Sequence, residues 1–269
     1  MSKAEPSDDL IYLHLASQYL AAAGKSFVDE RPDDSHTSMV WDSDEQTLWT
    51  QALNDEGLKL GLNVAAFALD LYHPLSDLVA SYPIKGARHL DIVNWMERER
   101  SFCGLDRPFV FDLHYDLPYD LSFEDSFTFQ AVEGERRTQH ASRRSDADKV
   151  LHDLVKAGSK TVKSEVRVWP HHFDTGLLLQ SEKVENLQFS LGMAMPDEVC
   201  SDWYYYVSAY RGEDAVDVKG LDALSNGSWR AEDFNGGVLS VEEADHAVAR
   251  SFFSEAINKL EEKLLLGEQ

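Results

Sequence analysis

Residues 164–179 read SEVRVWPHHFDTGLLL, and the rest of the chain is organised around this stretch. Val166 and Val168 alternate with polar residues, which predicts a strand with one buried face. Pro170 cannot donate a ladder hydrogen bond, so it places a corner at a strand edge, start or bulge. The apolar run after Gly176 predicts a second strand. We therefore expect a strand, a corner and a strand, with the corner at least partly open to a cavity.

The corner gathers one large aromatic side chain, two imidazoles and one carboxylate, those of Trp169, His171, His172 and Asp174. Side chains alternate between the two faces of a strand, so His172 and Asp174 are expected on one face and His171 on the other. A carboxylate beside an imidazole can fix its tautomer, which suits a general acid/base pair. The corner is therefore the first candidate site.

The composition points away from nucleic acids and membranes. The 269 residues include 48 acidic and 25 basic ones, for a formal net charge of −23. Such a charge repels phosphates and anionic lipid surfaces. Cys103 and Cys200 share no metal-ligand spacing, and the sequence has neither a signal peptide nor an apolar run of the roughly 20 residues that span a bilayer. These features predict a soluble, cytoplasmic protein with reduced thiols.

Apolar periodicity predicts an α+β fold, with antiparallel sheet and peripheral helices. Helices are expected over residues 8–22, 88–100, about 130–157, and 241–265. Gly24 is placed to end the first helix. Strands are expected at 37–41, 47–53, 58–71, 109–117, 187–195 and 203–210. Short polar connections usually put successive strands side by side, so the 203–210 strand should pair with 164–170 or 187–195.

Two segments of the chain share an order of features. Each has a helix, a Gly-Lys or Gly-Ser-Lys step, a strand with Val-Trp, a Leu…Gln pair, and then LKLGLNVA (58–65) or LQFSLGMA (187–194). This weak repeat predicts a single compact unit, 1–269, built from two similar halves, 1–120 and 121–269. A site would then be expected where the halves face each other.

The corner is also similar to a W-x-x-F-D motif, although here three residues rather than two separate the aromatic pair, in W-P-H-H-F-D over Trp169–Asp174. It is followed by Asp197, Glu198 and an aromatic strand with Tyr204–Tyr206 and Tyr210. In these features most of the chain resembles an uncharacterised bacterial family of domains of unknown function. It departs from the family pattern after Tyr210, where Arg-Gly replaces a proline-rich turn, and in its double histidine. The resemblance implies a single soluble α+β unit and no known activity.

Three His–carboxylate pairs have the same-face spacing of a strand: Asp34 with His36, His114 with Asp116, and His172 with Asp174. A divalent transition metal needs imidazole and carboxylate ligands from separate elements. The candidate metal ligands are therefore His36, His114, His172 and Asp174, as in a metal-dependent hydrolase or oxygenase. In the alternative interpretation, each histidine is hydrogen-bonded to a neighbouring carboxylate or to the backbone.

Three functional hypotheses follow. The first is a small-molecule-binding protein with a His/Asp/aromatic pocket, because aromatic walls with a few polar groups suit small ligands. Its candidate ligand-binding residues are Trp169, His171, His172, Asp174, His36, His114, Tyr204 and Tyr206. The second is the metal-dependent enzyme. The third is a structural or interaction module in which the aromatic strand mediates self-association into a homo-oligomer. The sequence has no G-x-S-x-G, G-x-G-x-x-G or P-loop motif, and it assigns no catalytic residue.

Overall fold

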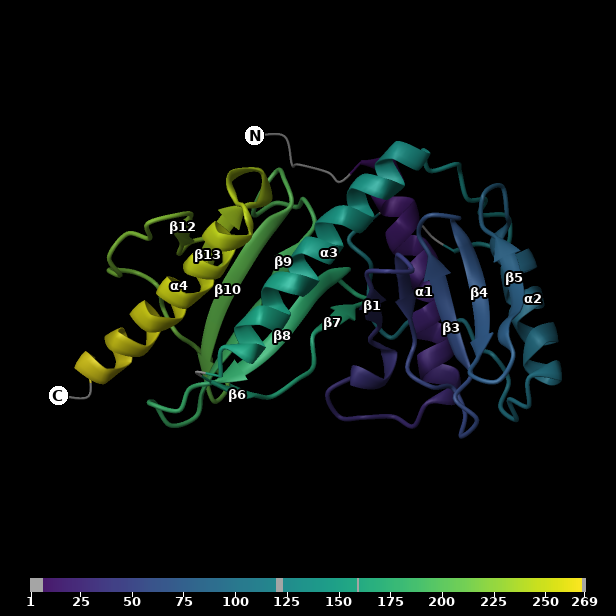
Figure 1. The fold of residues 1–269 in the computed structure, drawn as a ribbon, viewed down its shortest axis with the longest axis horizontal. Helices are drawn as coiled ribbons and strands as arrows, with labels where there is room; N and C mark the ends of the chain where they lie inside the picture. Colours follow the sequence, from purple (N-terminus) through teal and green to yellow (C-terminus); the bar gives the residue numbers. More distant parts are fainter. Residues whose placement is uncertain (1–6, 120–122, 159, 268–269) are drawn as a thin grey trace. The chain divides into compact units, whose positions relative to one another are not determined.

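The computed structural model describes residues 7–119, 123–158 and 160–267, and the chain divides into two compact units (Figure 1). The N-terminal unit consists of residues 7–145 together with 168–173. The C-terminal unit consists of 146–167 and the chain from 174 onward. The boundary therefore lies within helix α3 (Gly134–Lys156) and strand β7 (Arg167–Trp169), later in the chain than residue 120.

The N-terminal unit is an antiparallel meander with helices. Its sheet has the order β1-β2-β3-β4-β5, so each strand pairs with the next one in the chain. The strands are β1 (Val40–Asp42), β2 (Thr47–Trp49), β3 (Lys59–Asn63), β4 (Ala68–His73) and β5 (Asp77–Pro83). The helical elements are α1 (Asp8–Phe27), the 3-10 turn η1 (Ser35–Thr37) and α2 (His89–Phe102).

Helix α1 packs on β3, and the side of the sheet towards this helix is built from leucines. Alternate residues on β2, β3 and β4 are buried to 1% exposure or less, namely Leu48, Leu60, Leu62, Leu69 and Leu71. The residues between them point to the opposite side of the sheet, which we call the outer face. This alternation leaves the outer face free for polar and aromatic side chains.

Three expectations about local structure were wrong in this unit. Gly24 does not end α1, which continues to Phe27. A glycine is needed at this position because a Cβ would overlap the His36 carbonyl oxygen. The expected strand 58–71 is a hairpin of β3 and β4, in which Asn63 Oδ1 accepts a bond from the Ala66 N–H at 2.9 Å. Residues 109–117, all of which the structure describes, form no strand.

The C-terminal unit is a second antiparallel sheet, with order β12-β13-β10-β9-β8-β6 and with β11 paired to β10. Helix α4 and the last turns of α3 cover one face of it (Figure 1). Its strands are β6 (Thr161–Val162), β8 (Asp174–Gln180), β9 (Leu187–Ala194), β10 (Tyr204–Arg211), β11 (Asp214–Ala215), β12 (Ser228–Arg230) and β13 (Gly236–Ser240). The chain then forms the 3-10 turn η2 (Val241–Glu243) and α4 (His246–Gly267).

The expected pairing of the aromatic strand is confirmed. β10 runs antiparallel to β9 along its whole length, from Tyr204 opposite Ala194 to Arg211 opposite Leu187. Tyr205 points to the helices, where its ring meets that of Phe253 on α4 at 5.7 Å between centroids. Tyr204 and Tyr206, its neighbours in the strand, therefore point to the outer face.

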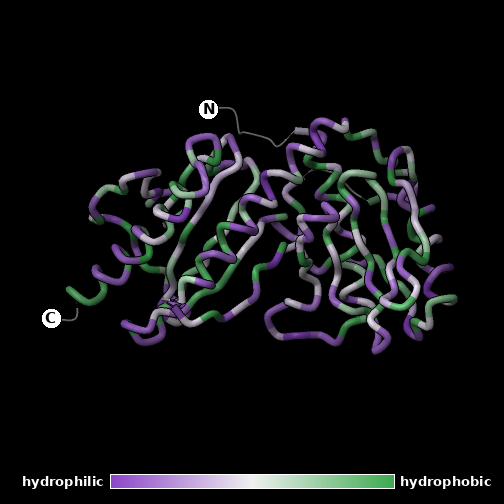
Figure 2. The backbone as a smooth tube through the Cα atoms, in the orientation of Figure 1, coloured by the Kyte–Doolittle hydropathy of each residue, from purple (hydrophilic) through white to green (hydrophobic). Residues whose placement is uncertain are grey.

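Across the described residues the chain forms α-helices and two antiparallel sheets, so the predicted α+β class is confirmed. Figure 2 shows hydrophilic and hydrophobic residues alternating along the strands and helices, as one buried and one open side require. Within the described part of the chain, none of the helices combines the length and the apolar character needed to cross a bilayer.

Candidate functional site

The corner after β7 is a tight turn rather than a continuing strand. β7 ends at Trp169 and β8 begins at Asp174, and the Phe173 N–H donates to the Trp169 carbonyl at 2.8 Å. Phe173 has a φ of +56°, so the alternation of a strand does not apply here. The expected strand, corner and strand are confirmed, and the opening of the corner to a cavity stays a prediction. The expectation that His172 and Asp174 lie on one face of a strand was wrong, because both histidines lie in the turn.

Residues of α1 hold the turn within the N-terminal unit. The Pro170 carbonyl accepts bonds from His14 Nε2 at 2.6 Å and from Gln18 Nε2 at 2.9 Å. His14 Nδ1 lies 2.8 Å from the Tyr119 hydroxyl and accepts a hydrogen bond from it, because Nε2 is already the donor. Burial lowers the pKa of His14 to about 3, so the imidazole is neutral at pH 7.

Aromatic and cationic groups complete this anchor. The Phe173 ring stacks on the His14 ring with centroids 5.0 Å apart and planes 9° apart. The Arg144 guanidinium lies 4.3 Å from the centre of the same Phe173 ring and donates to the Phe173 carbonyl at 3.0 Å. The arrangement fixes the turn and satisfies its buried carbonyls, which is a structural role. No local pattern connects His14 or Gln18 with this turn, since both lie about 150 residues earlier in the chain.

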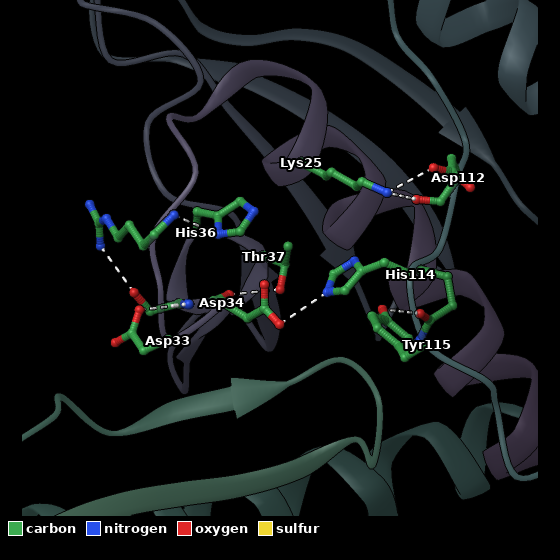
Figure 3. Close-up of polar contacts among 11 residues, drawn as sticks. Lys25, Asp33, Asp34, His36, Thr37, Asp112, His114 and Tyr115 are labelled. Atoms are coloured by element: carbon green, nitrogen blue, oxygen red, sulfur yellow. Dashed lines mark hydrogen bonds and ion pairs between the residues drawn. The ribbon is translucent and has the colours of Figure 1, made fainter.

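His36 and His114 lie in a polar patch of the N-terminal unit (Figure 3). His114 Nε2 is 3.1 Å from Asp34 Oδ2, and His36 Nδ1 accepts a bond from the Arg31 N–H at 3.3 Å. The expected pairs along one strand, Asp34 with His36 and His114 with Asp116, were wrong because residues 35–37 form the turn η1 and 109–117 form no strand. The bonds of these two histidines follow the alternative interpretation, a carboxylate for one and the backbone for the other.

The turn histidines form ring contacts in the same unit. The rings of His171 and His172 lie 4.5 Å apart, and His171 also contacts the rings of Tyr115 at 5.9 Å and Trp169 at 6.3 Å. His171 is half-buried and His172 is exposed. Among the residues that the structure describes, no three His, Cys, Asp or Glu side chains are grouped so as to hold a metal ion. The described residues therefore contain no group of side chains that matches the predicted metal ligands.

The remaining predicted residues, Asp174, Tyr204 and Tyr206, belong to the C-terminal unit. Asp174 is 7% exposed and accepts a bond from the Tyr206 hydroxyl at 2.5 Å. The Tyr204 hydroxyl donates to Asp197 Oδ2 at 2.9 Å. Burial, together with the negative charge of Asp174, raises the pKa of Tyr206. Both tyrosines thus use their hydroxyl groups inside the unit.

A hollow opens on the outer face of the N-terminal sheet. It has a volume of about 410 Å³ and is lined by Glu45, Thr47, Trp49, Asn63, Asp70, Tyr72, Asp77 and Leu78. These are the residues that alternate with the buried leucines of β2, β3 and β4, together with neighbours at the two ends of the meander. We refer to this set of eight residues as the hollow.

Gly61 positions the aromatic wall of the hollow. It stands opposite Trp49 in the β2–β3 ladder, and a Cβ at Gly61 would overlap the Trp49 ring, with Cε3 only 2.6 Å away. The missing side chain therefore lets the indole lie across β3. The Tyr72 ring on β4 lies 5.7 Å from the Trp49 ring at an angle of 58°. Two aromatic faces thus border one side of the hollow.

Carboxylates give the hollow a negative charge. Among the described residues, its lining contains Glu45, Asp70 and Asp77 and no Lys, Arg or His. Asp70 accepts bonds from the Ser81 hydroxyl at 2.5 Å and from Asn63 Nδ2 at 3.3 Å. Neither donor carries a charge, so the field of Asp70 is not neutralised by its partners. An aromatic pair beside carboxylates is suited to a cation.

The sequence contains a signal for the hollow that the predicted site residues do not include. Thr47, Trp49 and Asp70 alternate with leucines within segments that were expected to be strands, and Tyr72 directly follows the second of these segments. The predicted site, chosen for its histidines, lies at the corner instead. No family model, curated protein or solved structure matches this chain significantly. The resemblance to a bacterial family of unknown function therefore stays a prediction from the residues alone.

Proposed function

We propose that this chain is a binding protein whose hollow on the N-terminal sheet takes a cationic group, a protonated amine or a guanidinium. The observation that carries the proposal is the Trp49–Tyr72 pair set among three carboxylates with no basic residue in the described lining. The proposal keeps the small-molecule-binding hypothesis and places its site on the sheet. The ligand-binding roles predicted for the corner histidines and Trp169 stay predictions.

The expected affinity follows from the groups involved. A cation on an aromatic face gains about 0.5–2 kcal/mol, depending on how far it is desolvated. Each carboxylate at such an open site adds about 0–1 kcal/mol. A small amine should therefore bind with a free energy of about −3 to −4 kcal/mol, which corresponds to a Kd of about 1 mM or somewhat weaker. Binding should weaken as salt is added, because exposed charges are screened.

The test is a titration followed by the indole N–H resonance of Trp49, identified by its loss in Trp49→Phe. The probes are guanidinium and n-butylammonium, with urea and n-butanol as neutral counterparts of matched shape. We expect saturable shifts with the two cations only. Asp70→Asn should weaken binding about threefold, as loss of one exposed ion pair implies.

A control variant and a contrary result complete the design. Asp214→Asn removes an exposed carboxylate from β11, in the other unit, and should leave the titration unchanged. Equal shifts with the neutral probes would mean that the hollow has no preference for charge, and the proposal would be wrong. Shifts that never approach saturation well above the millimolar range would lead to the same conclusion.

A further inference from the structure

The outer face of the C-terminal sheet is covered by the chain itself. Val199, Tyr204 and Val238 form a buried cluster there, against which Phe234 packs together with Tyr206. The Phe234 ring meets the Tyr206 ring edge-on, with centroids 6.0 Å apart. Val199 comes from the connection between β9 and β10, and Phe234 from the turn between β12 and β13. Two peptide segments therefore lie on this face.

The two outer faces share one feature, a glycine that stands opposite a polar side chain of the next strand and leaves room for an aromatic ring. In the N-terminal sheet, Gly61 on β3 stands opposite Asp70 on β4, under the Trp49 ring. In the C-terminal sheet, Gly192 on β9 stands opposite Tyr206 on β10, and a Cβ at Gly192 would lie 2.7 Å from the Tyr206 hydroxyl. Each glycine thus leaves room for one aromatic ring. Where the C-terminal sheet has its covering segments, the N-terminal sheet has the hollow.

Exposed apolar side chains lie at the β4–β5 turn and on β5, next in sequence to Asp77 and Leu78 of the hollow. Leu75 is 90% exposed, Leu78 is 57% exposed and Val79 is 43% exposed. Single exposed apolar residues are ordinary. Three within five positions, next to a hollow that Leu78 itself lines, form a local apolar rim. The hollow and its rim together offer a site for a charged group and an adjoining site for an apolar one.

We propose that the hollow and the rim dock a basic peptide segment of a partner protein, with a lysine or arginine side chain in the hollow and a neighbouring apolar side chain on Leu75 and Val79. The covering segments of the C-terminal sheet are an example, within this chain, of polypeptide packed on a sheet face that has such a glycine. The charge of the hollow selects a basic segment. A second copy is disfavoured, because each chain carries a net charge of −23. This inference rests on the proposed function for its cationic half.

The test compares three probes by titration calorimetry or by the Trp49 resonance. The first is blocked lysine, N-acetyl-lysine amide. The second is a blocked peptide with one lysine between two leucines, and the third has norleucine in place of that lysine. We expect the lysine–leucine peptide to bind about tenfold tighter than blocked lysine, as burial of one leucine-sized surface implies. The norleucine peptide should lose most of this affinity.

Variants of the rim separate the inference from the proposed function. Leu75→Ser combined with Val79→Ser should remove the tenfold gain of the peptide and leave the affinity for blocked lysine unchanged. The control is Leu266→Ser on α4, where the side chain is 72% exposed, and it should change neither affinity. Equal melting temperatures of all three proteins would show that the fold is intact.

Each other outcome decides one of the two claims. If blocked lysine binds and the peptide binds no tighter, or if the gain survives in the rim variant, the docking inference is wrong and the cation site stands. If neither blocked lysine nor guanidinium binds, the cation site itself is wrong. Self-association in sedimentation that is lost in the rim variant would identify a second copy as the occupant and would overturn the choice of partner.

Discussion

The N-terminal sheet leaves Asp70 half-exposed opposite Gly61, whereas the C-terminal sheet uses Tyr206 opposite Gly192 to bond the buried carboxylate of Asp174. The polar group opposite the glycine therefore plays a different part in each sheet. On the covered face, polar groups satisfy one another and are expected to contribute to stability. On the open face they remain available to a ligand, and their removal should cost little stability. Substitutions at matched positions can break this comparison.

The largest effect is expected at a buried charge of the C-terminal unit. The Glu261 carboxylate on α4 is 1% exposed and lies 2.7 Å from Lys160 Nζ and 3.0 Å from Lys183 Nζ. Ser181 Oγ donates to it at 2.6 Å. Glu261→Gln leaves the buried ammonium group of Lys160 without its counter-charge, which should cost about 3 kcal/mol in the free energy of unfolding measured with urea.

The pH dependence of this prediction has a definite sign. Burial alone would raise the pKa of Glu261, but the bonds from Lys160, Ser181 and Lys183 outweigh it and lower the pKa. The stabilisation is therefore present above the ordinary Glu pKa of about 4.3 and is lost as the pH falls through the lowered value. The gap between Glu261→Gln and the parent should close in acid. Glu262→Gln, at the next and exposed position, should change stability by less than about 0.5 kcal/mol.

The paired glycines give the next effect. A Cβ at Gly192 would overlap the Thr175 carbonyl oxygen, part of the β8 backbone, and backbone cannot swing aside. At Gly61 the overlap is with side-chain atoms of Trp49 and Thr47 on the open face, which can move. Gly192→Ala should therefore cost about 2–3 kcal/mol and Gly61→Ala about 1 kcal/mol or less. Urea denaturation measures both, and equal costs would mean that the outer faces do not differ in rigidity.

The helices could be predicted from the sequence because their signals are local. The expected ranges 88–100 and 130–157 correspond to α2 at His89–Phe102 and α3 at Gly134–Lys156. Apolar spacing along the segment is enough to define α2, whereas α3 is highly charged and has large apolar side chains only in its last turns. The role of Gly24 could not be predicted in this way. What fixes that glycine is the His36 carbonyl, which approaches from a separate segment. Packing between distant segments leaves no local pattern.

The same difference between local signals and contacts of distant segments applies to the candidate site. The corner at Pro170 was predictable, because proline and the polar cluster mark it in the sequence. Its function as an anchor depends on His14, 156 residues away, and could not be predicted. The hollow was partly predictable, because Trp49 and Asp70 alternate with leucines in predicted strands and Tyr72 directly follows the second of these strands. The single long strand expected over 58–71 hid the β3–β4 turn and, with it, the register that brings these side chains together.

A smaller effect is expected for the covered tyrosine. Tyr206→Phe removes the donor of the buried Asp174 carboxylate and should cost about 1.5 kcal/mol. Tyr210→Phe, on the same strand but 42% exposed, should cost less than about 0.5 kcal/mol. Burial and the charge of Asp174 raise the pKa of Tyr206, so its contribution is present below the ordinary tyrosine pKa of about 10 and is lost as the pH rises further. Denaturation at neutral and strongly alkaline pH should show the difference between parent and Tyr206→Phe shrinking. A constant difference would contradict the bond to Asp174.

The smallest effect on stability is expected at Asp70. This residue stands opposite Gly61 on β4, as Tyr206 stands opposite Gly192 on β10. Asp70 is half-exposed, and its partners Ser81 and Asn63 are neutral. In Asp70→Asn the side-chain oxygen can still accept a hydrogen bond, and one charge is removed from a group of three carboxylates that repel one another. The free energy of unfolding should therefore change by less than about 0.5 kcal/mol, while the affinity for n-butylammonium falls about threefold. A loss of stability as large as that of Tyr206→Phe would mean that Asp70 serves the fold rather than a ligand, and that the two outer faces play the same part.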